Sequence, residues 1–98
     1  VHLITRDEAT VKTLASELNA TYSLGDVMQL GMLRQAILQG IEDDACLGLA
    51  YCVGSIVIKP IANISEQDLL DCYRLNTVGA IMALQTAKNA LKKSRGSV

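Results

Sequence analysis

The sequence predicts an α/β fold with a short parallel sheet, in the order β-α-β-α-β-α. Three short apolar segments alternate with longer segments in which apolar residues recur every three or four positions. The connections between the apolar segments are too long for hairpins, and strands that are joined through a helix run parallel. Of the 98 residues, 50% are hydrophobic and 19% are charged, which is typical of a globular chain. This length suits one domain or part of a larger one.

Local patterns predict the first two strands and the helix between them. Residues 1–5 are mostly apolar and β-branched, as in a strand that is buried on both faces. Asp7 and Glu8 then open a helix, because acidic side chains suit the positive end of the helix dipole. Apolar residues at helical spacing continue this helix to Asn19. Residues 20–24 predict the second strand.

The remaining elements follow from the same patterns. Residues 28–40 carry apolar side chains on one side of a helix, and residues 46–52 are almost wholly apolar, which predicts a third strand. The Ser-x-x-Asp motif at residues 65–68 is an imperfect capping box that opens the last helix. The helical pattern runs to about Ser94, and Gly96 is expected to close it.

Cysteine usage and charge exclude several classes. Cys46, Cys52 and Cys72 form no C-x-x-C pair, and an odd count favours the cytoplasm or another reducing compartment over a disulfide framework. Cys46 and Cys52 are an even number apart on the predicted strand, so both are expected to be small hydrophobes on one buried face. The net charge of -1 argues against a nucleic-acid surface. No apolar run approaches the roughly 20 residues that cross a bilayer. His2, the sole histidine, is expected to be packed and not to bind a metal.

Asn76 and Gly79 stand within the last helical segment, although both are poor helix formers. A chain that places both there needs them, either for close packing or for polar work inside the protein. The order of a strand, a glycine turn at Gly54 and a helix with an internal Asn is typical of half of a nucleotide-binding α/β unit.

Taken in order, these motifs resemble the middle of a short-chain dehydrogenase/reductase, the Rossmann-fold family of NAD(P)-dependent oxidoreductases. The resemblance covers essentially the whole chain and implies a partial Rossmann-like three-layer α/β/α arrangement. Asn76 resembles the Asn of the family's Asn-Ser-Tyr-Lys tetrad, whose backbone helps to hold a water in the proton relay. The implied partners are a dinucleotide cofactor and a small carbonyl or alcohol substrate.

The resemblance also implies cofactor-binding positions. Arg6 falls where members that use NADP often place a basic residue against the adenosine 2′-phosphate, for which a guanidinium offers a bidentate grip. An NAD site would instead want a carboxylate at the end of this strand. Asp26 and Val27 resemble the family's Asp-Val pair, in which the carboxylate and the following backbone contact adenine.

Cys52 and Gly54 belong to a segment that stands where the family usually carries Asn-Asn-Ala-Gly along the cofactor. Only the Gly is kept here. Simpler roles exist as well: a solvated loop charge for Arg6, helix capping for Asp26 and a plain turn for Gly54. Under the family interpretation, Arg6, Asp26 and Gly54 border one crevice at the ends of three parallel strands.

Two family motifs are absent from the sequence. No tyrosine has a lysine four residues later, and no glycine has another glycine four residues later, as the family's Gly-x-x-x-Gly-x-Gly turn requires. Residues 1–98 are therefore interpreted as a single partial NAD(P)-binding domain that lacks the first strand with its glycine turn and the Tyr/Lys segment. It would be a fragment of an NADP(H)-dependent oxidoreductase, inactive as the isolated chain.

Other interpretations remain open. In full-length relatives the Asn-bearing helix often packs against its mate in a dimer, which implies a homo-oligomer formed through Ile81, Leu84 and Leu91, although a single chain's core could use the same stripe. A non-catalytic structural or oligomerisation module is the strongest alternative. A methyltransferase-type Rossmann domain would want an acid where Arg6 stands. A receiver domain would need an acidic cluster at strand ends, where only Asp26 is suitably placed.

Overall fold

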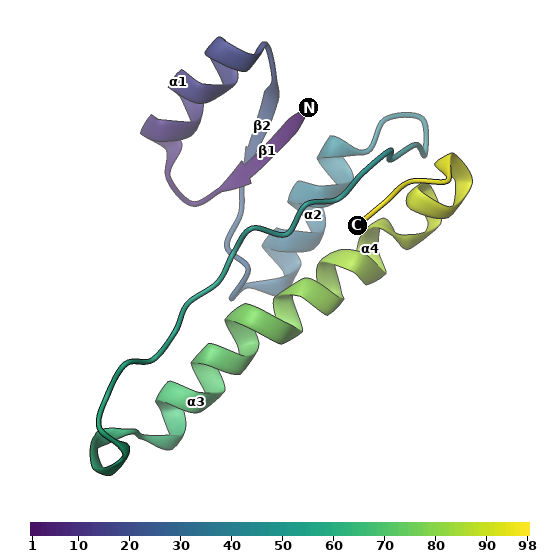
Figure 1. The fold of residues 1–98 in the computed structure, drawn as a ribbon. Coiled ribbons are helices and arrows are strands. Elements are labelled where there is room, and N and C mark those ends of the chain that lie inside the picture. Colours follow the sequence, from purple (N-terminus) through teal and green to yellow (C-terminus); the bar gives the residue numbers. More distant parts are fainter.

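The computed structural model describes all residues, 1–98 (Figure 1). Strands β1 (His2–Thr5) and β2 (Thr21–Leu24) pair in parallel, with helix α1 (Glu8–Leu18) between them in the chain. Helix α2 (Leu30–Gly40) follows, and α1 and α2 lie on opposite faces of the two strands (Figure 1). This half of the chain confirms the predicted β-α-β-α order and the parallel pairing.

The second half is dominated by one long helical column (Figure 1). It consists of helix α3 (Glu66–Tyr73), the π-helical turn η2 (Arg74–Val78) and helix α4 (Gly79–Ser94), and a short 3₁₀ turn η1 (Ile61–Asn63) precedes it. Extended chain runs back along this column before η1 (Figure 1). The predicted single helix is therefore interrupted at the residues that carry Asn76.

The predicted third strand at residues 46–52 does not form. Its backbone pairs only with Ser97, through a parallel bridge at Gly48 in which Leu49 N–H donates to Ser97 O over 2.9 Å and Ser97 N–H donates to Leu47 O over 3.1 Å. A strand needs a ladder of several residues on a neighbouring strand, and β1 pairs only with β2. The segment is apolar, as a buried strand would be, but no neighbouring strand is present to which its backbone could form a ladder of hydrogen bonds.

The inference that both cysteines of this segment are buried is wrong for Cys52. Cys52 is exposed, whereas Cys46 is half-buried and packs against the core. Without a sheet on either side, the alternation of faces that the strand pattern assumed does not hold here. The Leu47 side chain, 81% exposed, shows the same effect.

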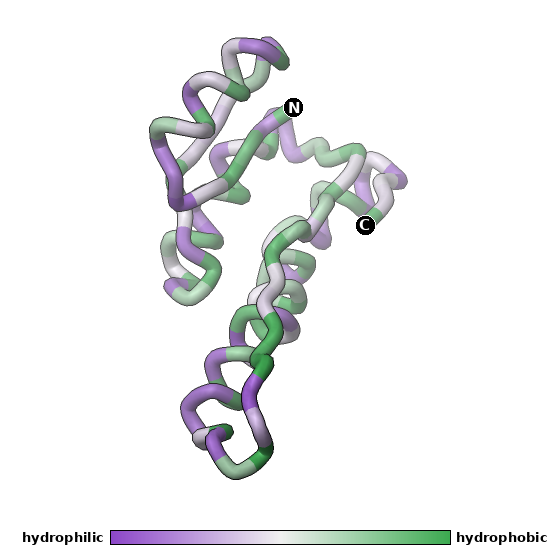
Figure 2. The backbone as a smooth tube through the Cα atoms, turned by 60° about the vertical axis from the view of Figure 1, so that its left-hand side comes forward, coloured by the Kyte–Doolittle hydropathy of each residue, from purple (hydrophilic) through white to green (hydrophobic).

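The core lies between α2 and α4. Leu33 and Ile37 of α2 are buried against Ala83, Ala87 and Leu91 of α4. On the α4 side, two of these three residues are alanines, and small side chains allow two helices to approach closely. Hydrophobic and hydrophilic residues alternate along the long helical column (Figure 2), as expected for helices that bury one side.

Helix ends combine confirmed and corrected predictions. The capping box is present: the Ser65 hydroxyl accepts from Asp68 N–H over 3.1 Å, and the Asp68 carboxylate accepts from Ser65 N–H over 3.0 Å. At the other end Arg95, not Gly96, adopts the left-handed conformation, with φ of 52°. Gly96 N–H then donates to Leu91 O over 2.8 Å, so Gly96 is the second residue of the C-terminal cap.

The molecule is elongated, with extents of 50 × 31 × 21 Å and a radius of gyration of 15.2 Å. A compact domain of this size has a radius of gyration of about 13 Å. Only 12 of the 98 residues are buried, and β1, predicted to be buried on both faces, is half-buried. None of the helices combines the length and the apolar character that a membrane-spanning helix requires.

Candidate functional site

Asn76 binds both backbone groups of one residue in the extended segment. Its Oδ1 accepts from Ser55 N–H over 2.9 Å, and its Nδ2 donates to Ser55 O over 2.7 Å. The same Nδ2 lies 2.9 Å from Cys72 O, one turn back in the helix. A carboxamide has two donor hydrogens, and this geometry directs them to Ser55 O and Cys72 O while the oxygen accepts from Ser55 N–H. Asn76 thus fixes the extended segment against the helical column at Ser55.

Asn76 lies in the π-helical turn η2, in which the helix winds more widely. Gly79 N–H donates to Arg74 O, five residues back. Single π turns are frequent at functional sites and mark the one place where a helix changes its hydrogen-bond register. The sequence signal for this turn was the pair of poor helix formers, Asn76 and Gly79, for which close packing or polar work was expected. Asn76 makes polar contacts, and Gly79 is buried against Tyr51.

Tyr51 is a member of the site that the sequence did not identify. Its hydroxyl donates to Leu75 O over 2.6 Å, next to Asn76. Burial raises the pKa of Tyr51, so the hydroxyl keeps its proton and remains a donor at neutral pH. A Cβ on Gly79 would lie within 3.3 Å of the Tyr51 ring carbon that bears the hydroxyl. Gly79 is therefore required for space beside the Tyr51 ring.

Arg74 joins the π turn to the loop after β2. Its Nη2 donates to Met28 O over 3.2 Å. Arg74, Leu75 and Asn76 are consecutive, and they contact the β2–α2 loop, Tyr51 and Ser55 respectively. One helical turn thus holds together chain segments that are far apart in the sequence.

Asp26 and Val27 lie in the β2–α2 loop. Asp26 Oδ1 accepts from Met28 N–H over 2.9 Å, and Asp26 O accepts from Gln29 N–H over 2.9 Å. The cap residue of α2 is Gln29, so Asp26 shapes the turn before the helix and is not its N-cap. Val27 is half-buried, and its side chain packs against the core.

Arg6 and Asp7 follow β1 directly. Arg6 is exposed, and its side chain has no hydrogen-bond or ion-pair partner in the molecule. Asp7 is the N-cap of α1: one carboxylate oxygen accepts from Thr10 N–H over 3.2 Å and the other from the Thr10 hydroxyl over 2.5 Å. These bonds lower the pKa of Asp7. The expectation that Asp7 begins the helix is confirmed.

Gly54 and Cys52 lie in the extended segment beside the π turn. A Cβ on Gly54 would come within 3.0 Å of Asn76 Oδ1, so a glycine suits this close approach. Cys52 is exposed and free. No hydrogen bond joins the Cys52 side chain to another residue of the site.

The structure therefore brings the expected residues together in two groups. Gly25 N–H donates to Thr5 O over 3.0 Å, which places Arg6 and Asp26 just beyond the paired ends of parallel strands. Gly54 and Asn76 form the second group, and Arg74 links it to the first through Met28. The expected third strand end is replaced by extended chain that Asn76 holds in place.

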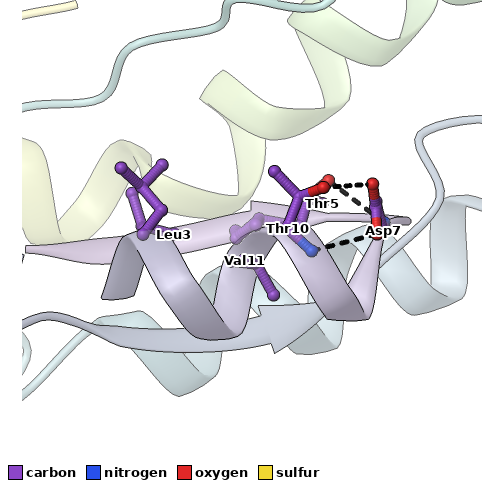
Figure 3. A pocket seen from close by; sticks show the side chains of 7 residues that line it. Leu3, Thr5, Asp7, Thr10 and Val11 are labelled. Carbon is purple, nitrogen blue, oxygen red and sulfur yellow. Dashed lines mark hydrogen bonds between the residues drawn. The ribbon is translucent and has the colours of Figure 1, made fainter. Parts of the chain in front are cut away.

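A hollow of about 290 Å³ lies between β1 and α1 (Figure 3). Thr5, Asp7 and Thr10 lie at one end of it, and Leu3 and Val11 lie further along (Figure 3). The polar groups at that end are bonded to one another, because Asp7 N–H also donates to the Thr5 hydroxyl over 3.2 Å. The hollow therefore presents an apolar wall with few free polar groups.

His2 is engaged within the sheet. Its two ring nitrogens lie 2.8 Å from the hydroxyl oxygens of Thr21 and Ser23. Burial lowers the pKa of His2. These contacts agree with the expectation of a packed strand residue.

No family model and no curated protein sequence matches the chain. Solved structures do match it. A short-chain dehydrogenase/reductase from Saccharomyces cerevisiae aligns with a TM-score of 0.88 at 21% identity, over 98% of this chain and 40% of that one. An actinorhodin polyketide ketoreductase variant with NADPH aligns with a TM-score of 0.84 at 18% identity, over 95% and 39%.

A gluconate 5-dehydrogenase from Burkholderia cenocepacia, solved with NADP and tartrate, aligns with a TM-score of 0.75 at 22% identity. That alignment covers 89% of this chain and 36% of the dehydrogenase. The chain thus spans 36–40% of the length of these three structures. Residues 1–98 have the α/β fold of a part of the short-chain dehydrogenase/reductase structures.

Proposed function

We propose that the chain forms the central part of the cofactor site of an NADP(H)-dependent short-chain oxidoreductase that interconverts a carbonyl and an alcohol. The observation that carries this proposal is Asn76, which stands in a π-helical turn and is bonded to the residue after Gly54, within a fold shared with these enzymes. Asn76 and Gly54 resemble family motifs, and the contact between their segments supports the proposal that the catalytic position lies beside the cofactor-lining segment. The bound nicotinamide would accept or supply the hydride.

The site chemistry suits a dinucleotide with a 2′-phosphate. Arg6 follows β1 and has an unengaged guanidinium, a group that binds phosphate in a bidentate manner. The neighbouring carboxylate, Asp7, accepts from Thr10 through both oxygens as the N-cap of α1, and it stands one residue after the strand-end position where an NAD site would want a carboxylate. The NADPH and NADP in two similar structures support the same assignment.

The other cofactor contacts follow from the loop after β2 and from the extended segment. The second carboxylate oxygen of Asp26 has no partner within the chain and, with the Val27 backbone, would contact adenine. Cys52 and Gly54 would line the cofactor further along, where the exposed backbone beside Asn76 allows close approach.

Catalytic turnover would need a proton donor that residues 1–98 do not provide. A tyrosine that donates near neutral pH needs a lowered pKa, and burial raises that of Tyr51, whose hydroxyl already donates to Leu75 O. We therefore propose that residues 1–98 are one partial domain, with the glycine turn and the Tyr/Lys pair supplied from outside it. The chain alone should leave NADPH unoxidised with any carbonyl, and turnover by the purified chain would refute this.

Cofactor choice is tested by titrating the ¹⁵N-labelled chain with NADP⁺ and NAD⁺ at millimolar concentrations. The amide signals of Asp26, Gly54 and Asn76 should shift, and NADP⁺ should bind about tenfold more tightly, as expected for a charge-assisted contact. Arg6→Ala should remove this preference. Arg34→Ala, which removes an exposed arginine from α2, is the matched control and should leave the preference unchanged.

Equal affinity for the two dinucleotides, or a preference that survives Arg6→Ala, would contradict the NADP assignment. Failure of both dinucleotides to shift any of these signals would favour the structural module. The experiment thus separates the choice of cofactor from cofactor binding itself.

Oligomerisation is the second candidate function. Ile81 and Leu84 are 54% and 42% exposed on α4, whereas Leu91, expected on the same interface, is buried in the chain's own core. A homo-oligomer that covers Ile81 and Leu84 would remove this apolar surface from water. Sedimentation equilibrium should show a dimer that dissociates in Ile81→Asp, and a monomeric wild type would exclude this interface.

The compartment is a further part of the proposal. Cys46, Cys52 and Cys72 are all free thiols in the structure. Free thiols persist in reducing surroundings, which supports the cytoplasm or another reducing compartment.

A further inference from the structure

The contacts around the π turn include one residue for which the proposed function has no role. Tyr51 stands in the extended segment, three residues before Gly54, and its ring packs against the core. Its hydroxyl donates to Leu75 O over 2.6 Å. The carbonyl belongs to the residue immediately before Asn76, so this bond acts on the backbone that carries the Asn76 side chain.

Gly79 makes this contact possible. Its φ of -58° is ordinary helical backbone, which alanine also adopts, so conformation does not require a glycine. Space does, because a Cβ would overlap the Tyr51 hydroxyl oxygen and would lie 3.3 Å from the ring carbon that bears it. Alanine has a higher helix propensity than glycine. The glycine therefore lowers the intrinsic stability of the helix but leaves room for the Tyr51 phenol.

We propose that Tyr51 is a positioning residue for Asn76: its hydroxyl anchors the π turn so that the Asn76 carboxamide meets both backbone groups of Ser55. Tyr51 and Asn76 then link the same two segments by hydrogen bonds in both directions. The Tyr51 side chain of the extended segment binds the helix backbone, and the Asn76 side chain of the helix binds the backbone of the extended segment. In this arrangement Tyr51 acts through the backbone that carries Asn76.

Ser55 supplies a local readout. It is exposed, and its N–H has a single acceptor, Asn76 Oδ1. Hydrogen exchange at the Ser55 amide therefore reports whether Asn76 is in place. Tyr51→Phe removes one donor and keeps the ring, so it should accelerate exchange at Ser55 about fivefold, the scale of one lost hydrogen bond. Amides of the α2–α4 core, such as those of Leu33 and Ala87, should exchange as in the wild type.

Tyr73→Phe is the matched control, because it makes the same chemical change at a side chain that is 58% exposed. It should leave Ser55 exchange unchanged. Unchanged Ser55 exchange in Tyr51→Phe would overturn the proposal. An equal acceleration at Ser55, Leu33 and Ala87 would also overturn it, since it would show a general loss of stability without any positioning.

A double-mutant cycle with Gly79→Ala gives a second measurement. In the wild type, Gly79→Ala should lower the urea midpoint and accelerate Ser55 exchange, because the Cβ displaces the phenol. In Tyr51→Phe the hydroxyl is gone and only the tighter 3.3 Å approach to the ring carbon remains, so the same substitution should lower the midpoint by less than in the wild type. Equal effects in the two backgrounds would overturn the proposal. Neither measurement involves a dinucleotide. A negative result here would therefore leave the proposed cofactor site untouched, and a failure of dinucleotide binding would leave the positioning role of Tyr51 untouched.

Discussion

Asn76 and Ser55 are paired as two residues of neighbouring strands would be, although one belongs to a helix. The carboxamide of Asn76 accepts from Ser55 N–H over 2.9 Å and donates to Ser55 O over 2.7 Å. It satisfies a peptide group that no strand partner reaches, because the extended segment has only the bridge to Ser97 at its other end. The Asn76 carboxamide therefore joins the helix to the extended chain through the same pair of hydrogen bonds that a backbone peptide group would make.

Replacing Asn76 should destabilise the chain in a way that depends on charge. Asn76→Ala removes the bonds to Ser55 and Cys72 and should cost about 1–3 kcal/mol of unfolding free energy in urea. Asn76→Asp should cost more at pH 7, because an ionised carboxylate only accepts and would face the carbonyl oxygens of Ser55 and Cys72. In acid the introduced carboxyl group is protonated and regains a donor, so the gap between the two variants should narrow as the pH falls.

Asn89→Asp is the control for this series. Asn89 lies on α4, is exposed and makes no side-chain hydrogen bond in the molecule. Its replacement should change the unfolding free energy by less than about 0.5 kcal/mol. Similar losses for Asn76→Asp and Asn89→Asp would show that the carboxamide of Asn76 does not hold the extended segment.

Local patterns predicted the parts of the fold that depend on neighbouring residues. The strands at residues 2–5 and 21–24, the N-cap at Asp7 and the capping box at residues 65–68 each rest on side chains within one or two turns. The prediction of a third strand was wrong because a strand at residues 46–52 needs a hydrogen-bonded neighbour. Whether such a neighbour exists depends on the whole chain and not on the local pattern. Asn76 likewise indicated that the helix is unusual at this position, but the sequence did not predict that the irregularity is a π turn.

The candidate site follows the same division. Arg6 and Asp26 were placed correctly after their strands, since strand ends are local features. Tyr51 was missed because its role depends on Leu75 and Gly79, 24 and 28 positions further along the chain. A glycine inside a predicted helix was the available signal: it indicates a packing reason for the missing side chain, without naming the residue that packs there.

Gly96 and Gly31 should respond oppositely to alanine. A Cβ on Gly96 would overlap Cys46 O and would lie 2.9 Å from Leu47 O, and these backbone atoms cannot move without breaking the contact with Ser97. Gly96→Ala should therefore destabilise the chain by about 1–3 kcal/mol. Gly31, in the first turn of α2, has no atom within 4 Å of its Cβ position, so Gly31→Ala should stabilise by about 0.4–1 kcal/mol.

Urea unfolding of the two alanine variants beside the wild type measures both effects. The informative quantity is the difference in sign, because both substitutions add the same methyl group. A Gly96→Ala variant as stable as Gly31→Ala would mean that the end of α4 does not pack against the backbone of residues 46–47.

Asp68 should titrate well below an ordinary aspartate. The Lys59 ammonium lies 2.9 and 2.8 Å from its two carboxylate oxygens, Ser65 N–H donates to it, and together they lower the pKa of Asp68 to about 2. The folded pKa lies below the unfolded value of 3.8, so the stabilisation is fully present above about pH 4 and is lost as the pH falls through about 2. The Tm difference between wild type and Asp68→Asn should therefore shrink from pH 7 to pH 2.

Carboxyl-carbon NMR should give the pKa of Asp68 directly, and Lys59→Met should return this pKa toward 3.8. A wild-type pKa already near 3.8, or a Tm difference that is the same at pH 7 and pH 2, would show that Lys59 does not hold the capping box of α3.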